Sequence, residues 1–327
     1  MQKRQLGATG PVVSAIGLGC MGMSHSYGPA DRAESIATIR AAMDAGVTLL
    51  DTGDFYGMGH NELLIREAIE GRRDEVQLSV KFGGMRDADG AFVGFDTRPN
   101  AAANFLAYSL ERLGTDHVDI YRPARLDPSV PIEDTIGGIA EQIEKGRVRH
   151  IGLSEVGAET IRRAHAVHPI VDLQIEYSVL ERGVEREILQ TTRELGISIT
   201  AYSVLGRGLI SATPPVIGSD DWRGHTPRFQ GDNLTQNLAL IQKLNEIAEN
   251  KGVTVAQLAI AWVAARGEDV VPLVGTTKRA RLNEAIGAVD VTFTERELQE
   301  IEAVVPVGAV AGTRYAAAQM AALDSER

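Results

Sequence analysis

The stretch Val47–Gly57 reads VTLLDTGDFYG, an apolar run that stops at a carboxylate and is followed, five residues later, by a tyrosine. A short apolar run between glycines is typical of a strand that is covered on both faces. We therefore expect Asp51 at the carboxyl end of a buried strand and Tyr56 in the loop that follows it.

A second apolar run, Val76–Lys81, also ends on an ionisable residue. Burying an unpaired charge is costly, so we expect Asp51 and Lys81 to pair at one rim of the sheet. If Tyr56 joins them, the ammonium should favour the phenolate and lower the pKa of Tyr56 from about 10. Such a phenol exchanges a proton near neutral pH. Taken singly, each residue also fits an ordinary strand end or a packed loop tyrosine.

The composition describes an acidic protein with one cysteine. At 327 residues and 44% hydrophobic content, the chain can bury a large core. The lone Cys20 excludes a disulfide framework and fits a reducing compartment, so we expect a cytoplasmic protein. The net charge of −11 argues against a nucleic-acid partner, and no segment has the length of a membrane span. The seven histidines lack metal-ligand spacing, so no metal is expected.

Short apolar runs alternate along the chain with longer segments of helical periodicity. Strands are expected at residues 14–18, 47–51, 76–81, 118–122, 149–154, 171–176, 197–202 and 270–274. Helices are expected at residues 33–45, 61–69, 100–113, 132–145, 158–167 and 184–195, and a short hairpin around residues 7–10. Glycines that should stop four helices in the left-handed conformation are Gly46, Gly114, Gly146 and Gly196.

This alternation predicts parallel strands, and eight such units predict a single-domain (β/α)8 TIM barrel over residues 1–327. Functional residues of that fold lie at the carboxyl ends of its strands. A rival interpretation comes from Gly17–Gly22, which matches the dinucleotide fingerprint GxGxxG of a doubly wound sheet. That fingerprint has to open a helix, whereas Gly28 and Pro29 interrupt the segment that follows, so we favour the barrel.

The motifs resemble the aldo-keto reductase family over nearly the whole chain. Those that carry the resemblance are residues 17–21 (GLGCM), 51–57 (DTGDFYG), Lys81, 151–154 (IGLS), 174–177 (QIEY), 201–208 (AYSVLGRG), 275–278 (GTTK) with Arg281 and Glu284, and 312–315 (GTRY). The resemblance implies an NADP(H)-dependent enzyme that reversibly reduces a small aldehyde or ketone to an alcohol. It makes Tyr56 the general acid, Lys81 the residue that tunes it, and Asp51 the residue that keeps Lys81 charged.

The resemblance also implies a set of cofactor contacts. Ser154 and Gln174 match the residues that bind the nicotinamide carboxamide, and Tyr202 matches the aromatic ring stacked on the nicotinamide. Residues 203–208 match the loop that faces the pyrophosphate, with backbone N–H groups as donors. Lys278 and Arg281 can meet a 2′-phosphate, which favours NADP(H) over NAD(H). The full set is Gly19, Cys20, Met21, Asp51, Ser154, Gln174, Tyr202, Ser203, Val204, Leu205, Gly206, Gly208, Gly275, Thr277, Lys278, Arg281 and Glu284.

Two positions depart from the family. Ala285 stands where an asparagine usually meets the adenine, and Ala124 stands where a histidine usually positions the carbonyl at the end of the fourth strand. Two consequences are open. Either Arg125 or Arg122 polarises the substrate carbonyl in place of the histidine, in which case we count Arg125 as the catalytic residue, or the enzyme is slow. The potassium-channel β-subunit branch, which this chain also resembles, likewise lacks the histidine. An alternative function is therefore an NADP(H)-binding redox sensor or regulatory subunit with little turnover.

Two further segments are expected near the site. The long loop 210–233 has the length of a lid over cofactor and substrate, and the C-terminal segment 305–327 resembles the tail of the family. Candidates for lining the substrate pocket are Trp222, Phe229 and Tyr315, although each also fits plain packing. The sequence leaves the identity of the carbonyl and the oligomeric state open.

Overall fold

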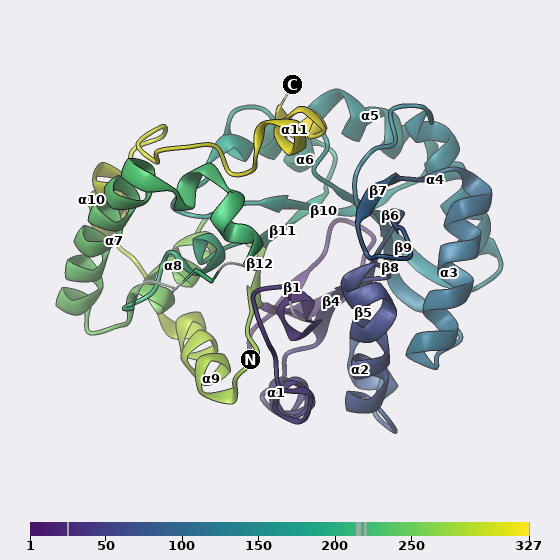
Figure 1. Ribbon diagram of the computed structural model, residues 1–327, viewed down its shortest axis with the longest axis horizontal. Coiled ribbons are helices and arrows are strands. Elements are labelled where there is room, and N and C mark those ends of the chain that lie inside the picture. The colour runs from purple at the N-terminus through teal and green to yellow at the C-terminus, as the bar shows by residue number, and fades with distance from the viewer. Residues whose placement is uncertain (25, 214–216, 219–220, 327) are drawn as a thin grey trace.

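The computed structural model describes residues 1–24, 26–213, 217–218 and 221–326, and its centre is a closed barrel of eight parallel strands (Figure 1). All eight predicted strands are present, with ends that differ from the predicted ones by at most three residues. Around the barrel they run β3 (Gly17–Gly19), β4 (Leu49–Gly53), β5 (Gln77–Phe82), β8 (Val118–Pro123), β9 (Val148–Ser154), β10 (Ile170–Glu176), β11 (Ser198–Tyr202) and β12 (Val270–Gly275). The predicted (β/α)8 barrel is confirmed.

Helices surround the barrel, and the six that were predicted are present. They are α1 (Arg32–Asp44), α2 (His60–Ala68), α3 (Pro99–Leu113), α4 (Ile132–Glu144), α5 (Ala158–Val167) and α6 (Ile188–Glu194). The last begins four residues later than predicted, because Gly183–Glu185 forms a separate short turn of 3-10 helix, η4. The four predicted glycine stops all have positive φ. The remaining helices are α7 (Gly231–Lys251), α8 (Val255–Ala264), α9 (Arg279–Ile286), α10 (Glu295–Val304) and α11 (Ala317–Ala321).

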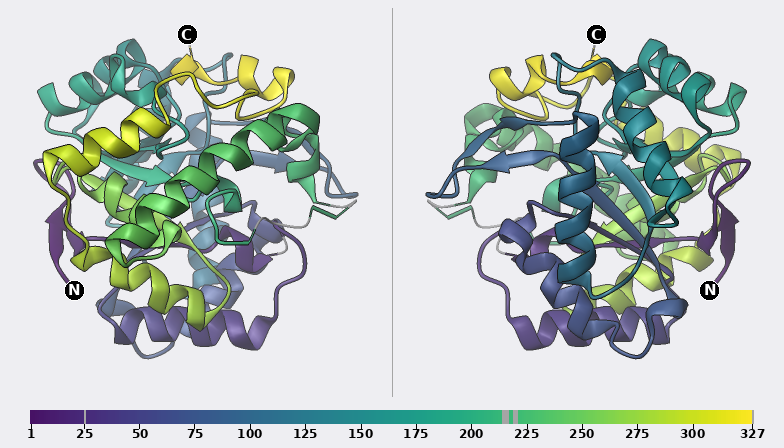
Figure 2. Two further views of the ribbon diagram at one scale, coloured as in Figure 1. Left: turned by 90° about the vertical axis from the view of Figure 1, so that its left-hand side faces the viewer. Right: turned by 90° about the vertical axis from the view of Figure 1, so that its right-hand side faces the viewer.

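One mouth of the barrel is closed by the predicted N-terminal hairpin, β1 (Lys3–Gln5) and β2 (Val12–Ser14). Leu6 and Val13 of this hairpin pack with the inward apolar side chains of the barrel, among them Leu49 and Ile120. Figure 2 shows this hairpin at one edge of the molecule and a second, unpredicted hairpin at the opposite edge. The second hairpin pairs β6 (Gly84–Arg86) with β7 (Phe92–Phe95). The open mouth therefore lies at the carboxyl ends of the strands.

The alternation of side chains along β4 places the functional carboxylate. Leu49 faces the barrel interior, Leu50 packs in the outer core between strands and helices, and Asp51 faces inward again. Asp51 is thus the middle residue of β4 and not its end, because the strand continues through Gly53, which pairs with Lys81 of β5. The expected position at the carboxyl end was wrong by two residues.

The expected lid also differs in its details. Within residues 210–233, the structure shows the short helices η6 (Trp222–His225) and η7 (Pro227–Phe229), and α7 already begins at Gly231. Residues 214–216 and 219–220 of that loop lie outside the described residues. Among the residues described, no helix combines the length and the apolar character that crossing a bilayer requires. No cluster of His, Cys, Asp or Glu suited to a metal ion occurs in the same part of the chain.

Candidate active site

Above the apolar layer of the barrel interior lies a buried ion pair. Arg122 of β8 contacts Asp172 of β10 at 2.9 Å, and both side chains are fully buried. Arg122 also donates to Ser79 Oγ at 2.9 Å, and Thr200 donates to Asp172 at 2.6 Å. The hypothesis that Arg122 polarises the substrate carbonyl is therefore wrong, because Asp172 pairs with its guanidinium inside the barrel, below the open mouth.

Asp51 is the centre of the next layer. Its Oδ1 lies 2.5 Å from Lys81 Nζ, and its Oδ2 accepts hydrogen bonds from Ser79 Oγ at 2.9 Å and from Gln174 Nε2 at 2.7 Å. The predicted pairing of Asp51 with Lys81 is confirmed, and both residues are almost completely buried. Burial lowers the pKa of Lys81, while the charge and hydrogen bond of Asp51 oppose that effect.

Tyr56 begins the short helix η2 (Tyr56–Gly59) beyond β4. Its ring centroid lies 5.2 Å from Lys81 Nζ, and its ring meets the neighbouring Phe55 edge to face at 4.9 Å. The three predicted residues therefore converge at one mouth. The expected lowering of the tyrosine pKa is wrong: burial, followed by the nearby Asp51 carboxylate, raises the pKa of Tyr56 well above its usual range.

The loop that carries Tyr56 is held by a buried asparagine that the sequence did not single out. Asn61, in the first turn of α2, accepts a hydrogen bond from Thr52 Oγ1 at 2.7 Å and donates to Cys20 O and Ser24 Oγ, each at 2.8 Å. Asn61 is fully buried, so these bonds tie the ends of β3 and β4 together. The sequence placed Asn61 at the start of a predicted helix, and nothing in that position indicated that its side-chain amide would link two strands.

Arg125 lies at the mouth beside the residues matched to the nicotinamide. Its guanidinium donates to Ala124 O at 2.6 Å and to Ser154 Oγ at 3.2 Å, and it reaches Tyr315 Oη at 3.5 Å. Tyr315 comes from the C-terminal segment and shares a hydrogen bond of 2.9 Å with Tyr202 Oη. The positive charge of Arg125 opposes the rise in the pKa of Tyr56.

The other predicted cofactor residues follow the carboxyl ends of neighbouring strands. Gly19 of β3 and Gly275 of β12 are in register. A Cβ on Gly19 would lie 3.8 Å from backbone atoms of Val274 and Gly275, and a Cβ on Gly275 would lie 3.8 Å from Gly19 O. Packing within the protein would thus tolerate a side chain at either position, and the absence of one at both fits the close approach of a cofactor. Residues that lie beyond the strand ends are Cys20 and Met21 after β3, Ser203, Val204, Leu205, Gly206 and Gly208 after β11, and Thr277, Lys278, Arg281 and Glu284 after β12.

Some predicted contacts are already occupied. The N–H groups of Gly206 and Gly208 donate within their own turn, to Ser203 O at 2.7 Å and Leu205 O at 2.9 Å, so they are not free donors. The Cys20 side chain is fully buried, and its N–H donates to Asp51 O at 2.9 Å. Arg281 pairs with Glu284 at 2.8 Å. By contrast, Lys278 is exposed and forms no ion pair with any residue that the structure describes.

The aromatic candidates for the pocket separate into two groups. Tyr315 lies among the site residues, and Trp222 packs near Tyr27 and Arg207, with ring centroid distances of 5.9 Å to Tyr27 and 5.1 Å to the Arg207 guanidinium. Phe229 belongs to the hydrophobic core, where it is 6% exposed. Its burial there favours the plain packing that the sequence left open as an alternative.

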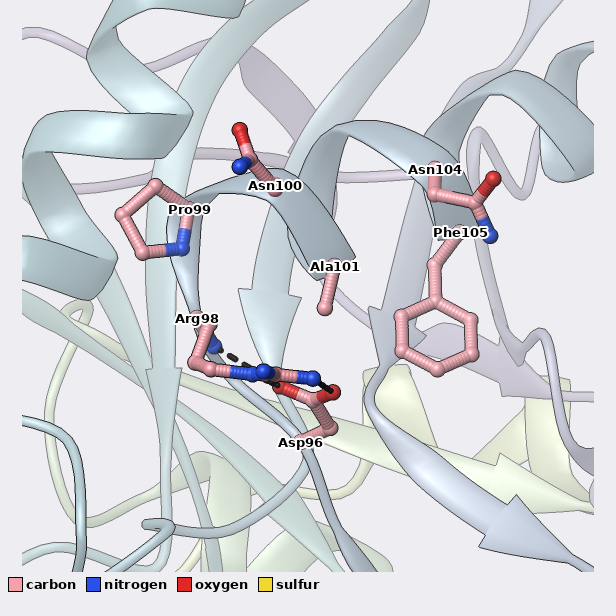
Figure 3. Close-up of a pocket in the computed structure, with 7 residues that line it drawn as sticks. All are labelled: Asp96, Arg98, Pro99, Asn100, Ala101, Asn104 and Phe105. Atoms are coloured by element: carbon pink, nitrogen blue, oxygen red, sulfur yellow. Dashed lines mark hydrogen bonds and ion pairs between the residues drawn. The ribbon is translucent and has the colours of Figure 1, made fainter.

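A hollow of about 580 Å³ lies at the N-terminus of α3, away from the predicted residues (Figure 3). Its charged lining residues, Arg98 and Asp96, form an ion pair at 2.6 Å, in which Arg98 is largely exposed. The lining residues are Asp96, Arg98, Pro99, Asn100, Ala101, Asn104 and Phe105. None of them is a predicted site residue, so we assign no chemistry to this hollow.

Comparison with known proteins agrees with this geometry. The model of the Aldo/keto reductase family matches residues 15–306. The chain belongs to this family. It is an oxidoreductase of the aldo-keto reductase class. The chain is 41% identical over 324 residues to a protein of Glycine max named probable aldo-keto reductase 1, and the match covers 96% of this chain and 92% of that protein.

Solved structures show the same barrel as this aldo-keto reductase. An aldo-keto reductase of Bacillus halodurans in its holo form has a TM-score of 0.80 at 27% identity, over 94% of this chain and 97% of that one. A glycerol dehydrogenase of Gluconobacter oxydans has a TM-score of 0.84 at 24% identity, over 92% of this chain and 94% of that one. At this identity the likeness supports the fold alone. The resemblance to the potassium-channel β-subunit branch stays a prediction.

Proposed function

We propose that this aldo-keto reductase uses NADPH to reduce a small aldehyde or ketone to the alcohol, and that it also runs in reverse. The observation that carries the proposal is the buried pair of Lys81 and Asp51, with the amine 5.2 Å from the ring centroid of Tyr56 at the open mouth of the barrel. Proton donors in an enclosed site of this kind are suited to general acid catalysis.

Tyr56 acts as the proton donor in this proposal. Bound NADPH supplies hydride for the carbonyl carbon. Because its pKa is raised, Tyr56 is protonated at neutral pH and can donate to the carbonyl oxygen. The Lys81 ammonium, held by Asp51, offsets the negative charge that remains on the phenol. In the reverse direction the same oxygen accepts the proton from the alcohol.

Arg125 takes the part that the family histidine plays elsewhere. Its guanidinium donates to Ser154 Oγ at 3.2 Å at the mouth, and its positive charge opposes the rise in the pKa of Tyr56, so this charge can stabilise the oxygen that becomes negative. Replacing Ala124 by histidine is expected to leave the rate unchanged or to lower it, because Ala124 is only 2% exposed and a larger side chain overpacks the site. Steady-state rates of Ala124→His measure this, and a gain of tenfold would show that Arg125 does not compensate.

Lys278 should select NADPH over NADH, because it is an exposed cation that follows Gly275 at the carboxyl end of β12. A lost charged hydrogen bond costs roughly 1.5–3 kcal/mol, so Lys278→Ala is expected to raise the KM for NADPH about tenfold or more and to leave that for NADH unchanged. Arg281→Ala should have a smaller effect, since Glu284 already engages Arg281. Arg296→Ala is the matched control, because Arg296 on α10 is also an exposed cation that pairs with a glutamate of its own helix, Glu300. It should leave the KM for both coenzymes unchanged. Equal effects on both coenzymes would rule out this role.

The second candidate function, a redox sensor or regulatory subunit that binds NADP(H), is favoured only by Ala124 at the position of the histidine. Oxidation of NADPH against a panel of aldehydes and ketones separates the two functions. Turnover of at least one carbonyl supports the reductase. Tight NADPH binding without turnover on the whole panel would support the sensor.

A further inference from the structure

Glu155, directly after Ser154 at the end of β9, has an unusual conformation and is almost completely buried. Its φ is +55°, in the left-handed region that non-glycine residues rarely adopt, and only 1% of the residue is exposed. Conformations of this kind persist where the surroundings hold them, and they gather at functional sites.

Both carboxylate oxygens of Glu155 are saturated by groups from three parts of the chain. Oε1 accepts from Tyr202 Oη at 2.7 Å, from Arg314 Nη1 at 2.8 Å and from the Glu176 N–H at 3.0 Å. Oε2 accepts from Arg314 Nη2 at 2.6 Å and from Ser325 Oγ at 2.6 Å. A bidentate guanidinium pair of this kind has a fixed geometry.

The same pair anchors the C-terminal segment. Arg314 is 3% exposed and also meets Glu326 at 2.8 Å, so residues 314–326 are fastened to the end of β9. Tyr315, the next residue, is thereby placed against Tyr202 at 2.9 Å between the hydroxyl oxygens, and its ring lies 4.1 Å from the guanidinium carbon of Arg207. Burial alone would raise the pKa of Glu155, but Arg314 outweighs it and lowers the pKa to about 2, so this carboxylate is charged.

We infer that Glu155 is a positioning residue for carbonyl reduction: its carboxylate orients Tyr202 and, through Arg314, holds Tyr315 at the barrel mouth. This inference rests on the proposed function. Glu155 itself accepts only, and its lone pairs are taken, so it acts through the two tyrosines and not on the substrate. The hydroxyl groups of Tyr202 and Tyr315, 2.9 Å apart, are thereby held together at the mouth of the barrel.

The test is the rate of the first turnover in Glu155→Gln. Wild type and variant are preloaded with NADPH, mixed with a carbonyl that the wild type reduces, and followed by stopped flow, with C4-deuterated NADPH to identify the phase that reports hydride transfer. We expect that phase to be at least tenfold slower in Glu155→Gln. A residue that only supports the fold would reduce the amplitude, as the folded fraction falls, and leave the rate constant unchanged.

A second readout needs no cofactor. Hydrogen exchange of residues 312–326 in the cofactor-free protein should be faster in Glu155→Gln, because Arg314 loses the carboxylate that accepts from both of its terminal nitrogens and keeps only Glu176 and Glu326 as charged partners. The matched control is Asp119→Asn, which breaks a partly buried ion pair with Arg73, 2.7 Å long, near the start of β8 at the other end of the barrel. It should lower stability with a wild-type rate constant and wild-type exchange of the tail.

Tyr202→Phe serves if Glu155→Gln does not fold, since it removes only the hydroxyl that Glu155 holds. A slower hydride-transfer phase in Tyr202→Phe supports the inference. A wild-type rate constant in either folded variant would overturn it. If the wild type itself shows no hydride-transfer phase with any carbonyl, the proposed function fails instead, so the two failures are distinguishable.

Discussion

Tyr56→Phe is expected to slow carbonyl reduction by about 10²- to 10⁴-fold, the range that a positioned general acid contributes. The phenylalanine keeps the ring beside Lys81 and Phe55 and loses only the proton donor. NADPH binding should change little, because every residue matched to the cofactor except Asp51 lies on or after another strand than β4. Stopped-flow reduction and NADPH fluorescence titration measure the two effects separately.

Tyr108→Phe is the matched control for this substitution, since Tyr108 lies on α3 and is 57% exposed. It should leave both rate and binding at wild-type values. Loss of NADPH binding together with loss of rate in Tyr56→Phe would mean that Tyr56 supports the structure of the mouth. A wild-type rate in that variant would assign the proton to another group.

The second large effect is expected from Asp51→Asn. The substitution removes the charged partner of buried Lys81, and breaking a buried pair in this way costs roughly 3–5 kcal/mol of stability. The carboxylate favours the charged amine, so its loss lowers the pKa of Lys81 further. If the reaction needs the ammonium, activity falls as pH rises through that pKa, and the alkaline limb of the kcat profile moves to lower pH.

The pH profile of kcat and a urea denaturation curve test both parts of this prediction. Asp119→Asn again serves as the control, because it breaks a pair with Arg73 remote from the mouth and should change stability without moving the limb. An Asp51→Asn enzyme with the wild-type alkaline limb would show that the charge of Lys81 is not what Asp51 contributes to turnover.

The strands were predictable because each is a short apolar run with its own boundaries. The position of Asp51 was misjudged by two residues, since a barrel strand can turn a polar side chain inward where the interior above the apolar layer is polar. The inward pattern of Leu49, Asp51, Ile120 and Arg122 becomes evident only once the barrel is closed. Side chains from separate strands then meet, which spacing along the chain does not reveal.

Electrostatic properties were less predictable than positions. The pairing of Asp51 with Lys81 followed from the cost of burying either charge alone, yet the direction of the Tyr56 pKa did not, because it depends on how deeply the hydroxyl is buried. Glu155 and Arg314 stand 159 positions apart, and neither lies in a pattern of charge that indicates a pair. Such long-range contacts are fixed by the path of the tail over the barrel.

The most direct test of the account follows the hydride and the proton donor together. Wild type and Tyr56→Phe are incubated with C4-deuterated NADPH and a panel of aldehydes and ketones, and the alcohols are analysed by mass spectrometry. We predict an alcohol with deuterium on the former carbonyl carbon from the wild type, and at least a hundredfold less of it from Tyr56→Phe. No labelled alcohol from the wild type with any carbonyl, or equal amounts from both proteins, would contradict the account.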